Sequence, residues 1–312
     1  MSDTTKSIVK RPIIVGMVTL STRNRITYIL LGLILIILGI LIYLKYWVYN
    51  LPKIAWIYWD TADLPPLINQ IRNNNATKLQ GWRINYLNKT ALANYIRQSE
   101  YPKNFETLIP QHKADWIRLH LLEKHGGVWL DASIIINDPT AMDRLYEKSV
   151  KTKSQFTGFS YRTDEQNSRS KYDLSLYIEN WFIMAPVNSI IIKLWLEQFE
   201  KAISMGFSEY KKSLAVQGID VSLIYNDSDS VYLTQHAALQ QVLQHQIKSN
   251  VPPLIIMPAE RDMFYIRHNC KNNDVCTMET IRSNPQEART LPYIKLVKGE
   301  RNTGIDISEI FN

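Results

Sequence analysis

The chain has 312 residues, of which 46% are hydrophobic, and a formal net charge of +7 at neutral pH. This composition suits one large domain or two small ones with a substantial core. The first 50 residues hold six basic residues and one acidic residue, so most of the positive excess lies outside the expected folded domain. A nucleic-acid-binding protein would carry that charge on the domain itself, and we therefore expect no nucleic-acid partner.

The first predicted element is a transmembrane helix over residues 26–47. Residues 26–44 form a run of 19 uncharged residues, flanked by the tyrosines and tryptophan that are typical of membrane interfaces. A helix of that length extends about 28 Å, close to the hydrocarbon thickness of a bilayer. A buried core helix is disfavoured because the run has no polar face. A cleaved signal peptide is disfavoured because no cleavage site follows the run.

The charges beside this run predict its orientation. Five basic residues precede it, within a basic tail over residues 1–25. The positive-inside rule places this tail in the cytoplasm and the large domain, residues 51–312, on the opposite side of the membrane. We therefore expect a single-pass (type II) membrane protein, and the sequence leaves the compartment open.

Strand and helix patterns alternate through the large domain. Short apolar and aromatic runs predict strands over residues 53–59, 82–87, 128–136 and 178–184. Helical patterns cover residues 65–75, 90–98 (with Thr90 as N-cap), 110–125, 188–203 and 231–246. Residues 157–175 are polar and aperiodic, which predicts a mobile loop, and residues after 250 predict short strands and loops. This order predicts an α/β fold with a mainly parallel sheet and helices on both faces.

Two cysteines, Cys270 and Cys276, lie close together near the end of the chain. In an oxidising compartment they could close a small loop, and two free thiols are the alternative. Two cysteines alone cannot form a closed zinc site.

The most informative segment is residues 114–136, ADWIRLHLLEKHGGVWLDASIII. It predicts a helix, a glycine pair and an apolar strand with Asp131 at its centre. A buried carboxylate costs several kcal/mol unless it is paired. Asp131 therefore requires a protein cation, a set of hydrogen-bond donors or a metal as its partner.

The preceding helix offers two candidate neighbours for this carboxylate. Asp115 and Arg118 are three residues apart and share one face of the helix. Gly126 and Gly127 allow a sharp turn that would bring both side chains near Asp131. The alternative is a helix-face ion pair worth under about 1 kcal/mol, with Asp131 capping a neighbouring helix.

The segment resembles the core of sugar-transferring families that carry a DXD motif. The shared pattern is Asp-x-x-Arg followed by Gly-Gly-Val-Trp-Leu-Asp, which here spans residues 115–131. Residues 51–60 (LPKIAWIYWD), 178–195 (IENWFIMAPVNSIIIKLW) and 232–240 (YLTQHAALQ) resemble further segments of these families in the same order. The chain is thus similar to the capsular polysaccharide synthesis proteins and to the family-32 glycosyltransferases over residues 51–250, the core of the large domain.

The resemblance implies a GT-A fold, a Rossmann-like α/β arrangement that binds a nucleotide-sugar donor. At the matching positions, Trp59 would lie against the nucleotide base and Trp129 would pack near the donor. Asp115 would accept hydrogen bonds from hydroxyls of the donor sugar, and Arg118 would contact the sugar or the diphosphate. The glycine pair before Trp129 would belong to the same donor-binding segment.

The resemblance also implies a divalent cation, Mn²⁺ or Mg²⁺, that bridges the two phosphates of the donor and stabilises the leaving group. Asp131 would lie by the metal and the ribose, so we expect a cation-bound diphosphate, and not the protein, to neutralise it. Family-32 enzymes usually carry a second acid at position 133, where this chain has Ser133. A hydroxyl is a weaker, neutral metal ligand, so metal dependence stays open unless Asp138 or Glu179 compensates.

Glu179 and Asn180 are catalytic candidates together with Asp131. Glu179 would face the acceptor or the reacting carbon, and Asn180 would hydrogen-bond the sugar. A strand with two polar caps is the alternative for this pair. His236 is expected to be a structural histidine. The tryptophans expected in the core are Trp116, Trp181 and Trp195.

The expected function is transfer of a sugar from a nucleotide-sugar to a glycan, lipid-linked or protein acceptor at a membrane, in polysaccharide or glycan synthesis. No nucleophile identifies the reaction as retaining or inverting. The alternative is a catalytically weak family member that acts as a membrane-tethered glycan-binding or scaffold subunit, an alternative that Ser133 supports. A metal-dependent phosphodiesterase is disfavoured because the six histidines form no cluster in the sequence.

Overall fold

The computed structural model describes residues 22–47, 49–161, 177–225 and 231–312. The chain divides into two compact units, Met1–Val48 and Tyr49–Asn312. The first unit contains helix α1 (Thr22–Trp47), whose large apolar side chains between residues 28 and 41 are exposed. Within the described residues, no helix combines the length and the apolar character that are required to cross a membrane.

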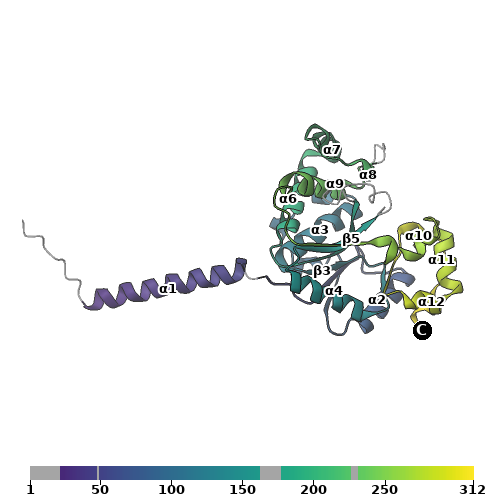
Figure 1. The fold of residues 1–312 in the computed structure, drawn as a ribbon, viewed down its shortest axis with the longest axis horizontal. Coiled ribbons are helices and arrows are strands. Elements are labelled where there is room, and N and C mark those ends of the chain that lie inside the picture. Colours follow the sequence, from purple (N-terminus) through teal and green to yellow (C-terminus); the bar gives the residue numbers. More distant parts are fainter. Residues whose placement is uncertain (1–21, 48, 162–176, 226–230) are drawn as a thin grey trace, which may run out of the picture. The chain divides into compact units, whose positions relative to one another are not determined.

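A six-stranded sheet forms the centre of the second unit, counted over the described residues, in the order β2-β1-β3-β6-β5-β7 (Figure 1). The strands are β1 (Ile54–Tyr58), β2 (Arg83–Leu87), β3 (Gly127–Leu130), β5 (Phe156–Tyr161), β6 (Tyr177–Ala185) and β7 (Leu254–Pro258). Strand β6 runs antiparallel to both of its neighbours, β3 and β5, and the other pairs are parallel. This arrangement confirms the predicted α/β fold with a mainly parallel sheet.

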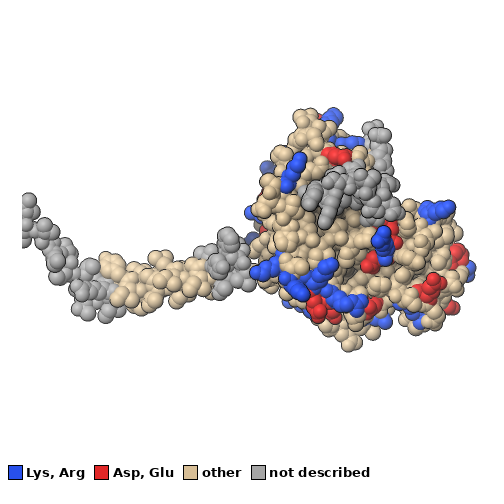
Figure 2. All heavy atoms as spheres, viewed as in Figure 1, with Lys and Arg blue, Asp and Glu red and all other residues tan. Residues whose placement is uncertain are grey.

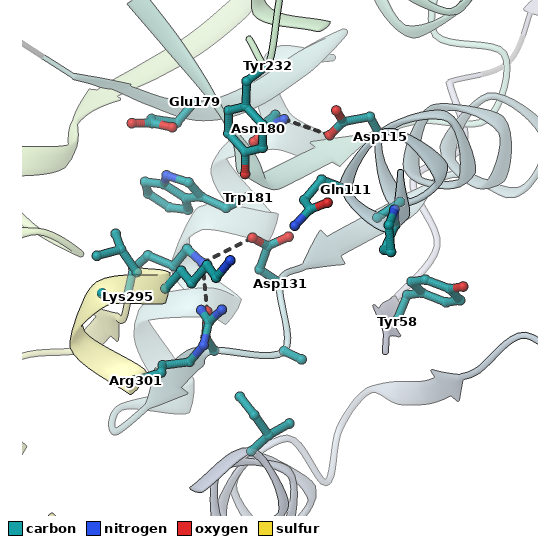
Figure 3. Close-up of a pocket in the computed structure, with 18 of the residues that line it drawn as sticks. Tyr58, Gln111, Asp115, Asp131, Glu179, Asn180, Trp181, Tyr232, Lys295 and Arg301 are labelled. Atoms are coloured by element: carbon teal, nitrogen blue, oxygen red, sulfur yellow. Dashed lines mark hydrogen bonds and ion pairs between the residues drawn. The ribbon is translucent and has the colours of Figure 1, made fainter. Parts of the chain in front are cut away.

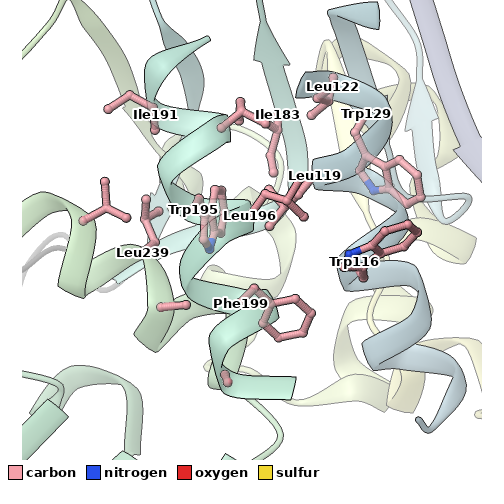
Figure 4. Close-up of a cluster of buried hydrophobic side chains, with 14 of the residues drawn as sticks. Trp116, Leu119, Leu122, Trp129, Ile183, Ile191, Trp195, Leu196, Phe199 and Leu239 are labelled. Carbon is pink, nitrogen blue, oxygen red and sulfur yellow. The ribbon is translucent and has the colours of Figure 1, made fainter. Parts of the chain in front are cut away.

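One face of the sheet is covered by three helices that form the largest hydrophobic cluster. They are α3 (Pro110–His125), α6 (Ile190–Met205) and α9 (Thr234–Gln241). Because side chains alternate along a strand, Trp56 of β1 and Trp129 of β3 both face these helices. Figure 4 shows Trp195 of α6 packed in this cluster close to Leu119 of α3. The helix over residues 110–125 has the predicted bounds.

The opposite face receives the alternate side chains of the same strands. Ala55 of β1 and Val128 of β3 pack there with Met142 of α4 (Pro139–Thr152). Helix α2 (Pro66–Lys78) packs against strand β4 (Ile134–Ile136) beside this layer. Helices therefore cover both faces of the sheet, as the alternating sequence pattern predicted (Figure 1).

The strand predicted over residues 128–136 is in fact two strands in two different sheets. Strand β3 ends at Leu130, and β4 begins at Ile134 and pairs antiparallel with β8 (Tyr293–Lys295). A tight turn joins them, because the backbone N–H of Ile134 donates to the Asp131 carbonyl at 3.0 Å. Asp131 therefore lies just beyond the carboxyl end of β3, where a carboxylate can reach solvent and ligand, and not in a strand interior.

The glycine pair before β3 is required by the backbone. Gly126 has φ of +62° and Gly127 has φ of +100°, conformations that L-residues with a side chain rarely adopt. A Cβ on Gly127 would lie 2.4 Å from the carbonyl oxygen of Ile54 in β1. The pair thus allows α3 to reverse into β3 and allows β3 to approach β1.

Most of the other predicted helices are present with shifted ends. Helix α6 begins after Ser189, whose hydroxyl accepts from the Ile192 N–H at 3.3 Å. The helix predicted over residues 231–246 is α9, continued by a π-helical turn. The helix predicted over residues 90–98 is instead two 3₁₀ turns. Thr90 forms no side-chain cap, because the backbone carbonyls of Asn88 and Thr90 accept from the N–H groups of Leu92 and Ala93. The remaining short elements before β7 are Ala91–Asn94, Gln98–Glu100, Phe105–Thr107, Phe207–Val216 (α7), Ser222–Tyr225 (α8) and Val242–Gln246.

Two further expectations differ from the structure. Residues 157–161 of the predicted loop belong to strand β5, and residues 162–175 lie outside the described part of the chain. The region after residue 250 is largely helical, although short strands and loops were expected. Its elements after β7 are Ala259–Arg261, α10 (Tyr265–Asn269), α11 (Asp274–Ser283), α12 (Pro285–Thr290), β8, α13 (Lys298–Arg301) and Ser308–Phe311.

The C-terminal segment, residues 259–312, folds onto the sheet through a separate hydrophobic cluster. Met278 and Ile281 of α11 and Ile294 of β8 pack with Ile68 of α2 and Ile135 of β4. Cys270 and Cys276 form a disulfide that spans the connection from α10 to α11, with Cα atoms 5.7 Å apart. Through β8, this segment reaches the turn that contains Asp131.

Candidate functional site

A cavity of about 1060 Å³ opens where β1 and β3 end. Ligands in α/β folds bind at the carboxyl ends of parallel strands, and a volume of this size accommodates a nucleotide-sized molecule. The site residues predicted from the sequence line this cavity, except for Gly126 and Gly127. The C-terminal segment contributes Lys295 and Arg301 to the same cavity, which Figure 3 shows beside Asp131.

Asp131 directly follows β3, and three donors surround its carboxylate. Trp129 Nε1 donates to Oδ1 at 3.0 Å, and Lys295 Nζ donates to Oδ2 at 3.0 Å. Arg118 Nη2 lies 3.5 Å from Oδ1. The side chain nevertheless keeps 27% of its surface exposed, so the cavity leaves room for a ligand beside it. Our expectation that the protein would not neutralise Asp131 is therefore wrong, because two of its own cations do so.

Opposing effects determine the pKa of Asp131. Burial alone would raise it, but the charges of Lys295 and Arg118 and the hydrogen bonds from Trp129 and Lys295 outweigh burial. The pKa consequently lies below the ordinary aspartate value, and the carboxylate is ionised at neutral pH. For its partner, burial lowers the pKa of the Lys295 ammonium and the Asp131 charge opposes that change.

Asp115, Arg118 and Asn180 form a single buried network on the α3 side of the cavity. Arg118 Nη2 lies 3.3 Å from Asp115 Oδ1, and Arg118 Nη1 donates to the Asn180 carbonyl at 2.8 Å. Asn180 Nδ2 donates to Asp115 Oδ1 at 3.1 Å and to Gln235 Oε1 at 2.6 Å. The Arg118 guanidinium also lies over the Trp129 ring, 5.1 Å from its centroid. The predicted approach of Asp115 and Arg118 to Asp131 is thus present.

Glu179 lies on the same wall of the cavity, one residue before Asn180 in β6. Its Oε2 is 3.7 Å from Nε2 of His236, and both side chains are buried. Within the described residues, neither ring nitrogen of His236 has a hydrogen-bond partner. His236 therefore differs from the structural histidine we expected, because it lines the cavity with its hydrogen-bonding capacity unused by the protein.

The tryptophans divide between cavity and core. Trp59 follows β1 and lines the cavity, with the Arg301 guanidinium 6.0 Å from its ring centroid. Trp116 and Trp195 are fully buried, which confirms the expected core positions. Trp181 is also buried but lines the cavity, and its indole N–H has no partner within the described residues.

Comparison with known proteins identifies the family. Residues 44–253 match the family described as "Capsular polysaccharide synthesis protein", and this match covers more than half of the chain. The chain belongs to the capsular polysaccharide synthesis protein family. The resemblance drawn from the motifs is thereby confirmed.

A curated relative of this family member is the "O-glycosyltransferase braB" of Annulohypoxylon truncatum. The two sequences are 26% identical over 163 residues, which cover 48% of this chain and 37% of the relative. The chain thus spans little more than a third of the length of that protein.

Two solved structures show weak likeness to the family member. The "PaToxG Glycosyltransferase" is 14% identical with a TM-score of 0.36, over 63% of this chain and 81% of that one. A glycosyltransferase involved in the glycosylation of the major capsid of PBCV-1 is 10% identical with a TM-score of 0.34, over 83% and 98%. Scores of this size do not establish a shared fold.

Three predicted residues lie in places that give them structural roles. Gly126 and Gly127 are at the start of β3, while Asp131 follows its end, so the family's glycine pair shapes the backbone and is separate from the cavity lining. Asp138 is the N-cap of α4, where its side chain accepts from the Thr140 N–H at 2.8 Å. It pairs with Arg144 at 3.2 Å and so cannot compensate for the missing acid at position 133.

The expected divalent cation does not fit the residues that were predicted to hold it. Lys295 Nζ donates to Ser133 Oγ at 2.7 Å and to Asp131 Oδ2 at 3.0 Å, so an ammonium lies between the two predicted ligands. Across the described residues, no three acidic, histidine or cysteine side chains form a group that could hold a metal. One carboxylate and one neutral hydroxyl that already share a cation are a poor ligand set for Mg²⁺ or Mn²⁺.

The sequence analysis missed four residues that line the cavity or join its network. Lys295 and Arg301 lie in the segment YIKLVKGER, whose basic residues recur every three positions. This spacing was visible in the sequence but belongs to no motif that indicates a binding site. Tyr232 and Gln235 lie in the segment YLTQHAALQ, which resembles the family. In that segment only the histidine has a side chain that predicts a site role from the sequence. The first of these segments could not be placed at Asp131 before the pairing of β4 with β8 was known.

Proposed function

We propose that this protein is a GT-A-type glycosyltransferase that moves a sugar from a nucleotide-sugar donor to a glycan, lipid-linked or protein acceptor. One observation carries the proposal: the two halves of the sequence motif, Asp115 with Arg118 and Asp131, meet in one cavity with Trp59, Glu179 and Asn180. Membership of a capsular polysaccharide synthesis family and the name of the fungal relative support it.

The cavity provides contacts that a nucleotide-sugar needs. The flat ring of Trp59 can stack on the base, and the network of Asp115, Arg118 and Asn180 presents acceptors and donors to sugar hydroxyls. Two cations, Lys295 and Arg301, lie between Trp59 and this network on the C-terminal side, where a diphosphate would lie. The donor would therefore extend from Trp59 towards Asp115.

The reaction exchanges one bond at the anomeric carbon of the donor sugar. An acceptor hydroxyl oxygen forms a bond to this carbon, and the bond from the carbon to the diphosphate oxygen breaks. The electron pair leaves with the nucleoside diphosphate, while the hydroxyl proton passes to a base. Positive groups that surround the diphosphate lower the barrier because its charge increases as the bond breaks.

We propose Glu179 as the residue that faces the acceptor. Its carboxylate lines the cavity beside His236, which can carry a proton and has a hydrogen-bonding nitrogen that the protein does not use. Asn180, the next residue, is tied to Asp115 and so connects the acceptor side to the donor-sugar network.

We also propose that residues 26–44 anchor the chain in a membrane, with the N-terminus in the cytoplasm and the large domain on the other side. The anchor is inferred from the uncharged run and from the exposed apolar side chains of α1 between residues 28 and 41, which Figure 2 shows in tan. A disulfide in the large domain fits a compartment outside the reducing cytosol.

A donor screen tests the enzymatic proposal. The full chain, purified in a mild detergent, would be incubated with a panel of uridine, guanosine and cytidine diphosphate sugars, and both thermal stabilisation and release of the nucleoside diphosphate would be measured. We expect one class of donor to raise the melting temperature and to be hydrolysed slowly without an acceptor. Absence of binding by every donor would contradict the proposal.

The second candidate is a catalytically weak, membrane-tethered glycan-binding subunit. The observation in its favour is the neutral Ser133 at the position of the second acid, bonded to Lys295. When oligosaccharides are added to the same panel, this function predicts thermal stabilisation by an oligosaccharide and no turnover of any nucleotide-sugar.

A further inference from the structure

The turn between β3 and β4 holds a cation that belongs to the protein. The three N–H groups of a lysine ammonium can each donate one hydrogen bond. In this structure the Lys295 ammonium has three oxygen partners, which are Asp131 Oδ2 at 3.0 Å, Ser133 Oγ at 2.7 Å and the Leu296 carbonyl at 3.3 Å. A carboxylate, a hydroxyl and a carbonyl are the kinds of ligand that otherwise hold a hard metal ion.

The position of this ammonium is fixed by the backbone on both sides. Lys295 pairs with Ile134 in the β4–β8 ladder, and the N–H of the next residue, Leu296, donates to the Ser133 carbonyl at 3.0 Å. The Lys295 N–H itself donates to the Met263 carbonyl at 2.9 Å. The side chain is only 6% exposed, so it has little freedom to leave the turn.

A second cation, Arg301, lines the same cavity and has no carboxylate within salt-bridge distance among the described residues. Arg301 lines the cavity, donates to the Leu296 carbonyl at 3.1 Å and lies over Trp59. Within the described residues Arg301 forms no ion pair, whereas the neighbouring Arg267 is paired with Asp274 and Glu300. Arg301 therefore offers a positive charge to a ligand that enters the cavity.

We propose that Lys295 takes the place of the divalent cation, so that the diphosphate of the donor binds without metal between Lys295 and Arg301. This inference rests on the proposed function. The two ligands predicted for the metal hold the ammonium, and a divalent ion at the same place would have to displace a buried charge. The positive charges of the buried ammonium and of the guanidinium stabilise the leaving diphosphate, and the guanidinium can also donate charge-assisted hydrogen bonds to it.

The position of Lys295 in the chain gives the inference a further consequence. The family match ends at residue 253, and both cations come from residues 259–312. Ser133 lies within the matched region and Lys295 outside it, and the β4–β8 pairing brings the two side chains into contact. The C-terminal segment is thus a part of the donor site.

Diphosphate binding with and without metal tests the proposal directly. Inorganic pyrophosphate, uridine diphosphate and guanosine diphosphate would be titrated calorimetrically into the full chain in EDTA, in MgCl₂ and in MnCl₂. We expect the affinity of the diphosphate that binds to be the same in EDTA as in metal, within about twofold. Mn²⁺ alone, followed by electron paramagnetic resonance, should remain free in the presence of the protein.

Variants assign the effect to Lys295. Lys295→Gln should lower diphosphate affinity by about tenfold or more, because one positive charge beside the diphosphate is lost. The control is Lys53→Gln, which removes a lysine whose Nζ lies 2.8 Å from Asp143 Oδ1, outside the cavity lining, and should leave affinity unchanged. The double variant Ser133→Asp, Lys295→Ala restores an acid pair without the ammonium and should bind Mn²⁺ and require it.

The outcomes separate the two proposals. Diphosphate binding that requires Mg²⁺ or Mn²⁺, or Mn²⁺ binding by the unmodified chain, would overturn the role of Lys295 and leave the proposed function standing. Binding of no diphosphate under any condition would overturn both. If Lys295→Gln does not fold, the comparison of EDTA with metal in the unmodified protein still decides the question.

Discussion

The two walls of the cavity differ in how their charges are used. On the α3 side, Asp115, Arg118 and Asn180 bond to one another, so their charges and hydrogen bonds are largely satisfied by the protein. On the C-terminal side, Lys295 has a single carboxylate partner, and Arg301 has none within the described residues. The first wall therefore fixes geometry, and the second supplies positive charge to a ligand. We therefore expect mutations on the first wall to lower mainly the free energy of unfolding and mutations on the second wall to lower mainly the affinity for the ligand.

Asp131→Asn should have the largest effect, because Asp131 contacts both walls. Loss of its charge leaves Lys295 and Arg118 without their shared partner. We expect donor turnover to fall by about 100- to 1000-fold, the range seen when one preorganised polar group is removed from an active site. Donor hydrolysis measured with the best nucleotide-sugar from the screen would show it. Turnover at the unmodified rate would exclude Asp131 from the site.

Arg118→Gln should mainly lower stability. Arg118 is buried, and its removal leaves Asp115 in the interior without its cation. We expect the free energy of unfolding of the large domain to fall by about 3 kcal/mol, measured by denaturant titration. The matched control is Arg144→Gln, which breaks an exposed pair with Asp138 and should cost less than about 1 kcal/mol. Equal losses in the two variants would contradict the distinction between the walls.

Arg301→Gln should show the opposite pattern. The diphosphate affinity should fall by about tenfold, because a charge-assisted contact to the ligand is lost. The free energy of unfolding should change by less than about 1 kcal/mol, since no carboxylate loses its partner. Calorimetric titration and denaturant unfolding of the same preparation would measure both quantities. A large loss of stability with unchanged affinity would assign Arg301 to the scaffold.

Asp262→Asn should have the smallest effect and should be visible only in the pH dependence of stability. Burial raises the pKa of Asp262 to about 6. Because this value exceeds the one near 4 in an unfolded chain, the contribution of Asp262 to stability should be fully present below pH ~4 and should fall as the pH rises through about 6. The Asn variant should remove this fall and be more stable at pH 8 by about 1 to 2 kcal/mol. The exposed Asp63→Asn is the control, and an unchanged pH profile for Asp262→Asn would contradict the assignment.

Local patterns were sufficient for four of the six strands in the described sheet and for the motif residues. The apolar runs that became β1, β2, β3 and β6, and the helix over residues 110–125, were recognisable because their periodicity or composition reflects burial in a two-sided sheet. Asp115, Arg118 and Asp131 could be placed together because the helix spacing and the glycine pair limit the path of the chain. The Thr90 cap was mispredicted because backbone carbonyls, and not the Thr90 hydroxyl, accept from the N–H groups of Leu92 and Ala93.

The sequence by itself determined the α/β fold, the family and the acidic centre of the site, because these depend on residues that are close along the chain. The tertiary structure decided what neutralises that centre. Lys295 is 164 residues away from Asp131 and reaches it only because β8 pairs with β4. A buried carboxylate requires a positive partner, but only the folding of a distant segment decides whether that partner is a metal or a lysine.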